Sequence, residues 1–506
     1  MATPVIPVET RLGLPFETHS DDPPPENIIA YISVEGAASV FAADAAQSLD
    51  EKTDAYHAPR DRRDMVRRDL EGSGFQILAE SRLGFSVSAP PGAYEELTGG
   101  TVITKERLMY AEENCIRYVT HLDIVGDEQP DALGVAKTRS DSTSIDGVVL
   151  ERPRMLNAMF PSPVPPSTPK FHLRVPDDVA TLLNAKPAHQ AGHRGQDVLV
   201  AMPDSGQFRH PFFTAHNYRV RTPITVVPGT NRSKDPVGHG TGESANIFAV
   251  APAAVLQAIR ASNNSGDLVG AIAGFLRAKE VNPRIITNSW GGDGPFPPPG
   301  PLDAGELAFA AEIQDAIEQN ILVVFSAGNG QFSMEPQVPG VLAAGGVFVG
   351  QNGDLRASDY TSGYRSPWFG GVRVPTVSGL VGMRPRAQYL MLPIPPACMI
   401  DIDESMTDLP ADETTDGTMG NDGWALFSGT SAAAPQLAGA AAVLIGAMPN
   451  ITPAQVIQAL TVTAVDVVSG RCHPRFNNAA LTGRDDATGT GLVDVAAALR
   501  FAQENF

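Results

Sequence analysis

Residues 197–349 carry the pattern that most constrains the fold. Apolar runs alternate there with helix-like segments, and the runs are nearly continuous instead of alternating with polar residues. They read DVLVAM (197–202), AVLQAI (254–259), RIITNSW (284–290), ILVVFSA (321–327) and GVLAAGGVFV (340–349). A strand that is apolar on both sides must be buried on both faces, which is typical of a parallel sheet covered by helices. We therefore expect an α/β fold with its functional groups at the carboxyl ends of the strands.

Length and composition set the broad class of the protein. At 506 residues and 42% hydrophobic content, the chain favours two globular domains over one. The formal net charge of -20 argues against nucleic-acid binding. Three widely spaced cysteines, Cys115, Cys398 and Cys472, indicate neither a zinc site nor a disulfide framework.

No segment predicts a membrane span or an export signal. Residues 1–20 lack a continuous apolar core, and the uncharged stretch FSGTSAAAPQLAGAAAVLIGAM (427–448) is interrupted by Pro435 and Gln436. We expect no membrane partner and a cytoplasmic protein, with leaderless export as the alternative.

The N-terminal region predicts a small α+β domain. After an acidic leader (1–26), a strand at 28–35, a helix at 61–71, strands at 75–80 and 83–89, a helix at 91–99 and a strand at 101–108 follow in turn. This order is that of a ferredoxin-like domain, which we place at residues 27–126. The alternative is that these segments belong to a larger sheet. A linker is expected at 127–170, because it loses periodicity and ends in PSPVPPSTP (161–169), and the second domain follows at 171–506.

Polar candidates stand at the predicted strand and helix ends. Asp204 ends the run DVLVAMPD, His239 opens a helix in VGHGTG, and Asn329 follows ILVVFSAG. An aspartate can hold a histidine in the tautomer that deprotonates a hydroxyl, and an asparagine N–H can stabilise an oxyanion. Taken singly, each also fits a structural role: Asp204 and Asn329 as turn residues and His239 as a helix cap.

Ser431 lies where an apolar helix is expected to begin. A hydroxyl there sits at the positive end of the helix dipole, beside N–H groups that have no intrahelical acceptor. Pro435 is compatible with such a start if it falls in or near the first turn. The alternative for Ser431 alone is an N-capping serine. The order Asp204, His239, Ser431 is nevertheless one found in a known serine hydrolase fold.

Residues 170–506 resemble the subtilisin-like serine proteases of the S8 peptidase family. The motifs that carry the resemblance are VLVAMPDSG, GHGTG, FSAGNG and SGTSAAAP, supported by NSWGG (288–292) and GTGLVDVAAAL (489–499). The N-terminal pattern resembles the propeptide domain that members of this family use as a chaperone and inhibitor.

The resemblance implies a serine endopeptidase made as a self-inhibited precursor. Ser431 would be the nucleophile, His239 the base, Asp204 its partner, and Asn329 the oxyanion donor together with the Ser431 backbone N–H. The resemblance also implies that a protein or peptide substrate binds as a strand along Ser289, Trp290 and Gly291, with Ala327 and Gly328 lining the first specificity pocket. Trp290 stands where leucine is common, and we expect its ring to form part of a pocket wall.

Cofactors are not expected to be required. The chain has only a short helix between His239 and AVAP (249–252), where many relatives insert a calcium-holding loop, so a calcium site at that place is doubtful. The acidic stretch around residues 401–422 leaves three readings open: a solvated loop, an attractor of basic substrates, or a cation site made of Asp401, Asp403 and Asp408.

Two other function classes remain as rivals. An inactive scaffold that binds peptides would not need all four site residues. An esterase of the α/β-hydrolase type would need a G-x-S-x-G motif and the order Ser, Asp, His, whereas here the serine comes last. For the N-terminal domain, the alternative to an inhibitor is a permanently attached partner-binding module.

Overall fold

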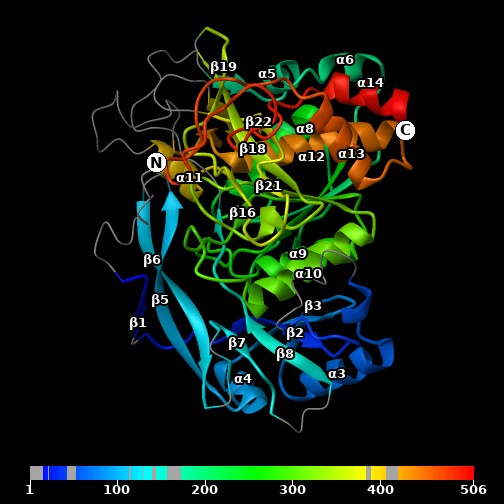
Figure 1. Ribbon diagram of the computed structural model, residues 1–506. Coiled ribbons are helices and arrows are strands. Elements are labelled where there is room, and N and C mark those ends of the chain that lie inside the picture. The colour runs from blue at the N-terminus through cyan, green and yellow to red at the C-terminus, as the bar shows by residue number, and fades with distance from the viewer. Residues whose placement is uncertain are drawn as a thin grey trace.

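The structure is a computed structural model that describes most of the chain in two parts. The described residues are 15–20, 22–42, 53–112, 115–127, 129–130, 132–139, 144–156, 172–350, 352–382, 389–405 and 420–506. The N-terminal part, blue to cyan in Figure 1, lies against helices α9 (Ala271–Glu280) and α10 (Ala304–Glu318) of the C-terminal part.

A nine-stranded sheet forms the centre of the C-terminal part. Its strands are β11 (Leu199–Asp204), β12 (Arg219–Val220), β13 (Ile224–Thr225), β14 (Val255–Arg260), β15 (Ile285–Asn288), β17 (Leu322–Ser326), β18 (Leu342–Val349), β19 (Leu355–Ala357) and β22 (Val377–Leu380). The main order is β12-β14-β11-β15-β17-β18-β19, and every pairing is parallel except β18 with β19. The predicted α/β fold with a parallel sheet is confirmed.

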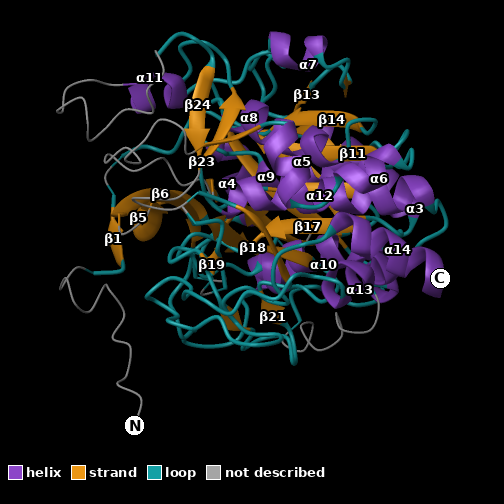
Figure 2. Ribbon diagram, turned by 90° about the horizontal axis from the view of Figure 1, so that it is seen from above, coloured by secondary structure: helices purple, strands orange, loops and turns teal. Residues whose placement is uncertain are grey.

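Helices cover both faces of this sheet, and its strands are seen among them in Figure 2. On one face, α8 (His239–Val250) and α12 (Thr430–Ala447) pack into a core that includes Val200 and Met202 of β11. On the other face, Ala201 belongs to the core of α9 and α10. Successive side chains of one strand therefore enter different cores, which explains the continuous apolar run.

Helix α12 is the central helix of the first core. Among the described residues it is the one helix long and apolar enough to cross a membrane, but 89% of its apolar window is buried inside the protein. Gly439 allows close contact with α8, because a Cβ at that position would lie 2.8 Å from the Ile247 carbonyl oxygen. The absence of charge on α12 is thus explained by burial on all sides.

Smaller elements surround the central sheet. The helices are α5 (Asp177–Leu182), α6 (Lys186–Gln190), α7 (Pro211–Ala215), η2 (Glu335–Gln337), α11 (Met399–Ser405), α13 (Pro453–Val462) and α14 (Val495–Asn505). The strands are β10 (His172–Arg174), β16 (Trp290–Gly291), β20 (Tyr364–Arg365), β21 (Arg373–Val374), β23 (Tyr389–Pro393) and β24 (Trp424–Phe427). Strand β24 leads directly into α12.

The N-terminal part contains a five-stranded sheet with the order β3-β4-β2-β8-β7. Its elements are β2 (Ile28–Val34), η1 (Asp54–Tyr56), α3 (Arg60–Gly72), β3 (Gln76–Glu80), β4 (Gly84–Ala89), α4 (Pro91–Thr98), β7 (Val135–Ala136) and β8 (Ile145–Leu150). Strand β8 pairs with β2, and its Val148 and Leu150 belong to the core of this sheet.

The prediction that residues 101–108 supply the last strand of this sheet is wrong. They begin β5 (Thr101–Glu112), which pairs with β6 (Cys115–Val125) and β1 (Glu17–His19) in a separate sheet. Strand β8 lies beside β2, in the place expected for residues 101–108. Because β8 comes from the segment predicted as a linker (127–170), the N-terminal sheet extends into that segment. A local alternating pattern indicates a strand, but it does not show with which other strand that strand pairs. The proline-rich segment 161–169 lies outside the described residues.

Carboxylates of α10 face the N-terminal sheet. Glu312 accepts hydrogen bonds from the Tyr31 and Ser81 hydroxyls, at 2.7 Å and 2.6 Å. Lys279 of α9 pairs with Glu312, and its ammonium lies 2.8 Å from Asp315. Glu312 and Asp315 are both fully buried. The junction of the two parts therefore contains buried carboxylates whose partners come from both parts.

The chain that follows β8 is also bound to the C-terminal part. Glu151 accepts hydrogen bonds from the backbone N–H groups of Ile272 and Ala273, at 3.3 Å and 3.0 Å, in the first turn of α9. A carboxylate is favourable at this end of a helix dipole. Arg152 lies 2.9 Å from Asp303, the N-cap of α10. Both helices are thus contacted at their starts by residues 151 and 152.

Candidate active site

The structure brings Asp204 and His239 into contact. Asp204 is the last residue of β11, and His239 is the first residue of α8, after Gly238 with φ of 93°. His239 Nδ1 lies 2.7 Å from Asp204 Oδ1, and both side chains are buried. Burial lowers the pKa of His239, but the Asp204 carboxylate, together with Glu243 and Asp235, outweighs it and raises this pKa to about 9.

Asp235 organises the turn that presents His239. Its carboxylate accepts hydrogen bonds from the Gly238 N–H and from both the N–H and hydroxyl of Thr241. It also accepts one from the Ser205 hydroxyl, which ties the α8 start to the end of β11. We did not single out Asp235 from the sequence. The available signal was an aspartate four residues before His239, since aspartates are common just before a helix begins.

Ser431 lies in the first turn of α12 and is joined to Ser289 by two hydrogen bonds. The Ser431 hydroxyl donates to the Ser289 carbonyl at 3.0 Å, and the Ser289 hydroxyl donates to the Ser431 carbonyl at 2.9 Å. Pro435 explains the second bond. The helix begins at Thr430, so Pro435 lies in its second turn and not in its first, and it lacks the N–H that would bond the Ser431 carbonyl. Ser289 supplies the missing donor.

Asn329 lies beside the start of α12. Its Oδ1 accepts hydrogen bonds from both the N–H and the hydroxyl of Thr430, each at 3.0 Å. These bonds fix the orientation of the side-chain amide, with its NH₂ group on the side away from Thr430. The neighbouring Gly328 has φ of 103° and its N–H donates to the Thr430 hydroxyl, while Ala327 is buried. The loop after β17 is therefore attached to the residue preceding Ser431.

A second carboxylate faces the other nitrogen of His239. Glu243 Oε1 lies 4.0 Å from His239 Nε2, and neither atom has a hydrogen-bond partner among the described residues. Burial raises the pKa of Glu243 to about 8, although His239 and the Asn246 side chain oppose this shift. Glu243 was not predicted as a site residue from the sequence either. Its position four residues after His239 on one helix face would have indicated the contact.

The side chain of Trp290 differs from expectation. It is fully buried, stacks on Phe309, and donates its indole N–H to the Pro203 carbonyl at 2.8 Å. It therefore packs into the core of α9 and α10 instead of forming a pocket wall. Because neighbouring side chains of a strand point to opposite sides, the local sequence could not show which side would be buried.

The edge of β16 is paired with a segment of the N-terminal part. Strand β9 (Met155–Leu156) runs antiparallel to β16, with Trp290 opposite Leu156 and Gly291 opposite Met155. In this register β9 runs toward Ser289, which contacts Ser431. The strand that the resemblance assigns to substrate binding thus already carries an extended segment of the same chain.

Of the three residues of the possible cation site in the acidic insertion, the structure describes Asp401 and Asp403. Asp401 is buried and accepts hydrogen bonds from the N–H groups of Ala397 and Gly423, at 2.7 Å and 3.4 Å, so it joins the two ends of the acidic insertion. Burial raises the pKa of Asp403. Asp408 lies outside the described residues.

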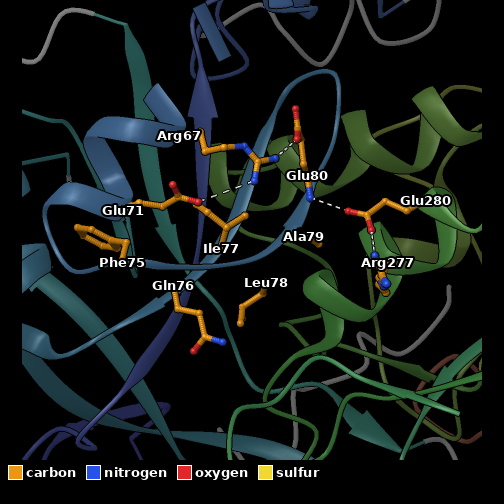
Figure 3. Close-up of a pocket in the computed structure, with 10 residues that line it drawn as sticks. All are labelled: Arg67, Glu71, Phe75, Gln76, Ile77, Leu78, Ala79, Glu80, Arg277 and Glu280. Carbon is orange, nitrogen blue, oxygen red and sulfur yellow. Dashed lines mark hydrogen bonds and ion pairs between the residues drawn. The ribbon is translucent and has the colours of Figure 1, made fainter. Parts of the chain in front are cut away.

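A pocket of about 590 Å³ lies away from these residues, at the junction of the two parts (Figure 3). Strand β3 and helix α9 line it, and the Glu80 N–H donates to Glu280 at 2.8 Å. Arg67 pairs with Glu80, and Arg277 with Glu280. None of Asp204, His239 and Ser431 lines this pocket, so it is separate from the candidate active site.

A model of the subtilase family matches residues 195–491, more than half of the chain. The chain belongs to the subtilase family. The match includes Asp204, His239, Asn329 and Ser431 and ends before α14.

This subtilase is similar to several named proteins. It is 28% identical over 343 residues to a probable subtilase-type serine protease of Deinococcus radiodurans, covering 62% of this chain and 41% of the relative. It is 27% identical over 295 residues to subtilisin NAT of Bacillus subtilis subsp. natto, covering 56% and 64%. Each match spans less than two thirds of the relative's length.

A solved structure extends the likeness to the fold. The crystal structure of fervidolysin from Fervidobacterium pennivorans, a keratinolytic enzyme related to subtilisin, has a TM-score of 0.52 to this subtilase at 17% identity. The alignment covers 94% of this chain and 61% of that chain. The subtilisin-like fold predicted from the sequence is confirmed.

Proposed function

We propose that this subtilase is a serine endopeptidase that cleaves peptide bonds through an acyl-enzyme. The hydrogen bond between Asp204 and His239, at the end of β11 and beside the Ser431 helix, carries the proposal. Ser431 attacks the scissile carbonyl, His239 takes its proton and returns it to the leaving amine, and Asp204 stabilises the imidazolium. The Asn329 amide and the Ser431 backbone N–H stabilise the oxyanion.

One rearrangement separates the described state from the reactive one. The Ser431 hydroxyl donates to the Ser289 carbonyl, whereas attack requires it to donate to His239 Nε2. His239 Nε2 has no hydrogen-bond partner among the described residues, so it is available to accept this bond once the Ser431 side chain turns away from Ser289. Catalytic hydrogen bonds are often formed only in the substrate complex, so this geometry is compatible with a competent serine.

Labelling by a fluorophosphonate probe tests the proposal. The wild-type protein should be labelled and should hydrolyse a casein substrate, whereas the Ser431→Ala variant should lose both activities, with a rate loss of at least about 10⁴-fold. The variant should remain folded, because one hydrogen bond contributes about 1 kcal/mol. Absence of serine-dependent labelling, even after removal of the N-terminal domain, would favour the inactive scaffold.

We further propose that the protein is made as a precursor inhibited by its N-terminal domain. The pairing of β9 with β16 supports this, since extended substrates bind by main-chain pairing along a strand edge and β9 occupies that edge. Cleavage in cis would need no second molecule, because the linker and Ser431 belong to the same chain and so meet at high effective concentration.

Mass spectrometry of the purified chain tests the precursor proposal. Residues up to Leu156 are held by β8 and β9, so we place the cut between residues 157 and 170. The wild type should show this cut and the Ser431→Ala variant should not. A whole chain that is fully active, with no gain on deletion of residues 1–125, would instead indicate a permanently attached module.

We propose that calcium is not required. Helix α8 continues from His239 to Val250 and reaches β14 through residues 251–254, which leaves no inserted loop at that place. Treatment with a chelator should therefore leave the melting temperature nearly unchanged. A large decrease would contradict the proposal and direct attention to the acidic insertion.

A further inference from the structure

The segment on the edge of β16 shows how a bound peptide would be positioned. Gly291 lies opposite Met155 and Trp290 opposite Leu156, and the next register position toward the reactive serine is Ser289. Because Ser289 is joined to Ser431 by two hydrogen bonds, a peptide residue opposite Ser289 has its carbonyl nearest the nucleophile. In the same register, a residue opposite Gly292 is the fourth residue before the cleaved bond.

Arg154 holds that fourth position. A Cβ built on Gly292 would lie 4.0 Å from both Arg154 Cδ and Glu335 Oε1, which places the three groups together. Arg154 Nε lies 2.7 Å from Glu335 Oε1, and a terminal guanidinium nitrogen lies 4.0 Å from Glu306 Oε1. The guanidinium also lies over the Phe309 ring, 5.7 Å from its centre. This combination of carboxylates and an aromatic face fits a guanidinium.

Glu335 depends on Arg154 for its counter-charge. Its side chain is fully buried, and Arg154 is the one cation among the described residues that pairs with it. The hydrogen bond that Glu335 accepts from the Gly292 N–H is long, at 3.4 Å. Burial raises the pKa of Glu335, whereas Arg154 opposes this shift. Loss of Arg154 would leave a buried carboxylate without a cation, which is strongly unfavourable.

We propose that Glu335, Glu306 and Phe309 form a subsite for a basic side chain, so that this subtilase prefers arginine or lysine at the fourth residue before the scissile bond. The inference rests on the proposed function, and on removal of the segment containing Arg154 after self-cleavage. The basic side chain of a substrate then takes the place of Arg154. Arginine is preferred to lysine, because its planar fork can contact both carboxylates.

Fluorogenic peptides that differ only in this residue test the proposal. The wild-type protein, expressed as the full chain and allowed to process itself, is assayed with arginine, lysine, norleucine or glutamate at the fourth position. We expect kcat/KM to be about 100-fold higher for arginine than for norleucine, with lysine between them. A second series places arginine at the third or fifth position, where the gain should be absent.

Variants of the carboxylates test whether they cause the preference for a basic residue at the fourth position. Glu335→Gln should reduce the ratio of arginine to norleucine to within about threefold, because the counter-charge is lost. If that variant does not fold because Arg154 is left unpaired, the double variant Arg154→Met with Glu335→Gln removes both charges. Glu318→Gln is the matched control, since Glu318 is also a carboxylate of α10 but bonds Thr53 instead of Arg154. The control should keep the wild-type ratio.

The outcomes distinguish the two proposals. Hydrolysis of every peptide at similar rates by the wild type would overturn the basic subsite and leave the proposed function intact. A preference that persists in the Glu335→Gln variant or the double variant would also overturn it. Absence of hydrolysis and of Ser431 labelling would overturn both proposals together.

Discussion

The proposed reactive centre and the junction between the two parts are both buried, but they are built from different interactions. In the centre, Asp204, His239 and Ser431 are held by the ends of β11, α8 and α12, and their contacts lie within the C-terminal part. At the junction, the carboxylates of α10 are compensated by groups that come from both parts. The centre depends on the position of backbone elements, whereas the junction depends on the balance of charge.

This difference predicts how each region responds to mutation. Removal of a side chain from the centre should lower the reaction rate while the surrounding elements keep the fold. Removal of a charge from the junction should lower stability while the chemistry is retained. The following predictions are ordered by the size of the expected effect.

Asn329→Ala should lower kcat by about 100- to 1,000-fold, because the side-chain N–H that stabilises the oxyanion is lost. The measurement is peptide hydrolysis under saturating substrate. Asn329→Asp is the control: it keeps the oxygen that accepts from Thr430 and removes the amide donor, so its kcat should be equally low. Near wild-type activity of the aspartate variant would show that the amide is not the oxyanion donor.

Lys279→Met should lower the free energy of unfolding by about 3 kcal/mol, because the buried Glu312 and Asp315 lose a shared cation. Chemical denaturation of the Ser431→Ala full chain, in which no self-cleavage is expected, measures the effect. Lys186→Met is a suitable control. Its ion pair with Asp177 is exposed, so it should cost less than about 1 kcal/mol. Equal costs for the two lysines would contradict the charge balance at the junction.

Glu243→Gln should move the acidic limb of the kcat/KM profile to lower pH by about one unit. Catalysis needs neutral His239, and an ionised Glu243 stabilises its protonated form and raises its pKa. Asp204 and Asp235 also raise this pKa and are retained in the variant. The variant should therefore gain relative activity below the wild-type midpoint. An unchanged midpoint would show that Glu243 does not act on His239 during catalysis.

Arg82→Met should have the smallest effect, a loss of at most about 1 kcal/mol. Arg82 pairs with the same Asp315 as Lys279, but its side chain is 42% exposed while that of Lys279 is 6% exposed. Water can replace much of the interaction at the exposed partner. Chemical denaturation of Arg82→Met and Lys279→Met compares an exposed with a buried partner of Asp315. A larger loss in the free energy of unfolding for Arg82→Met would contradict the role of burial.

Much of the fold followed from local sequence patterns. The apolar runs at 197–202, 254–259 and 321–327 became β11, β14 and β17, because a doubly covered strand requires apolar residues on both faces. The last strand of the N-terminal sheet did not follow, because the place beside β2 was assigned to residues 101–108 and is taken by residues 145–150. The tertiary structure decides this, because residues 101–108 belong to β5 and pair with β6 instead of β2.

The sequence by itself determined which residues stand at the strand and helix ends, since Asp204, His239, Asn329 and Ser431 each follow or open a segment with a clear pattern. The tertiary structure decided the partners of those residues. Ser289 satisfies the carbonyl that Pro435 leaves without a helical donor, and Arg154 pairs with Glu335. Such contacts join segments that are distant in the chain, and their energies depend on burial and distance, which no local pattern encodes.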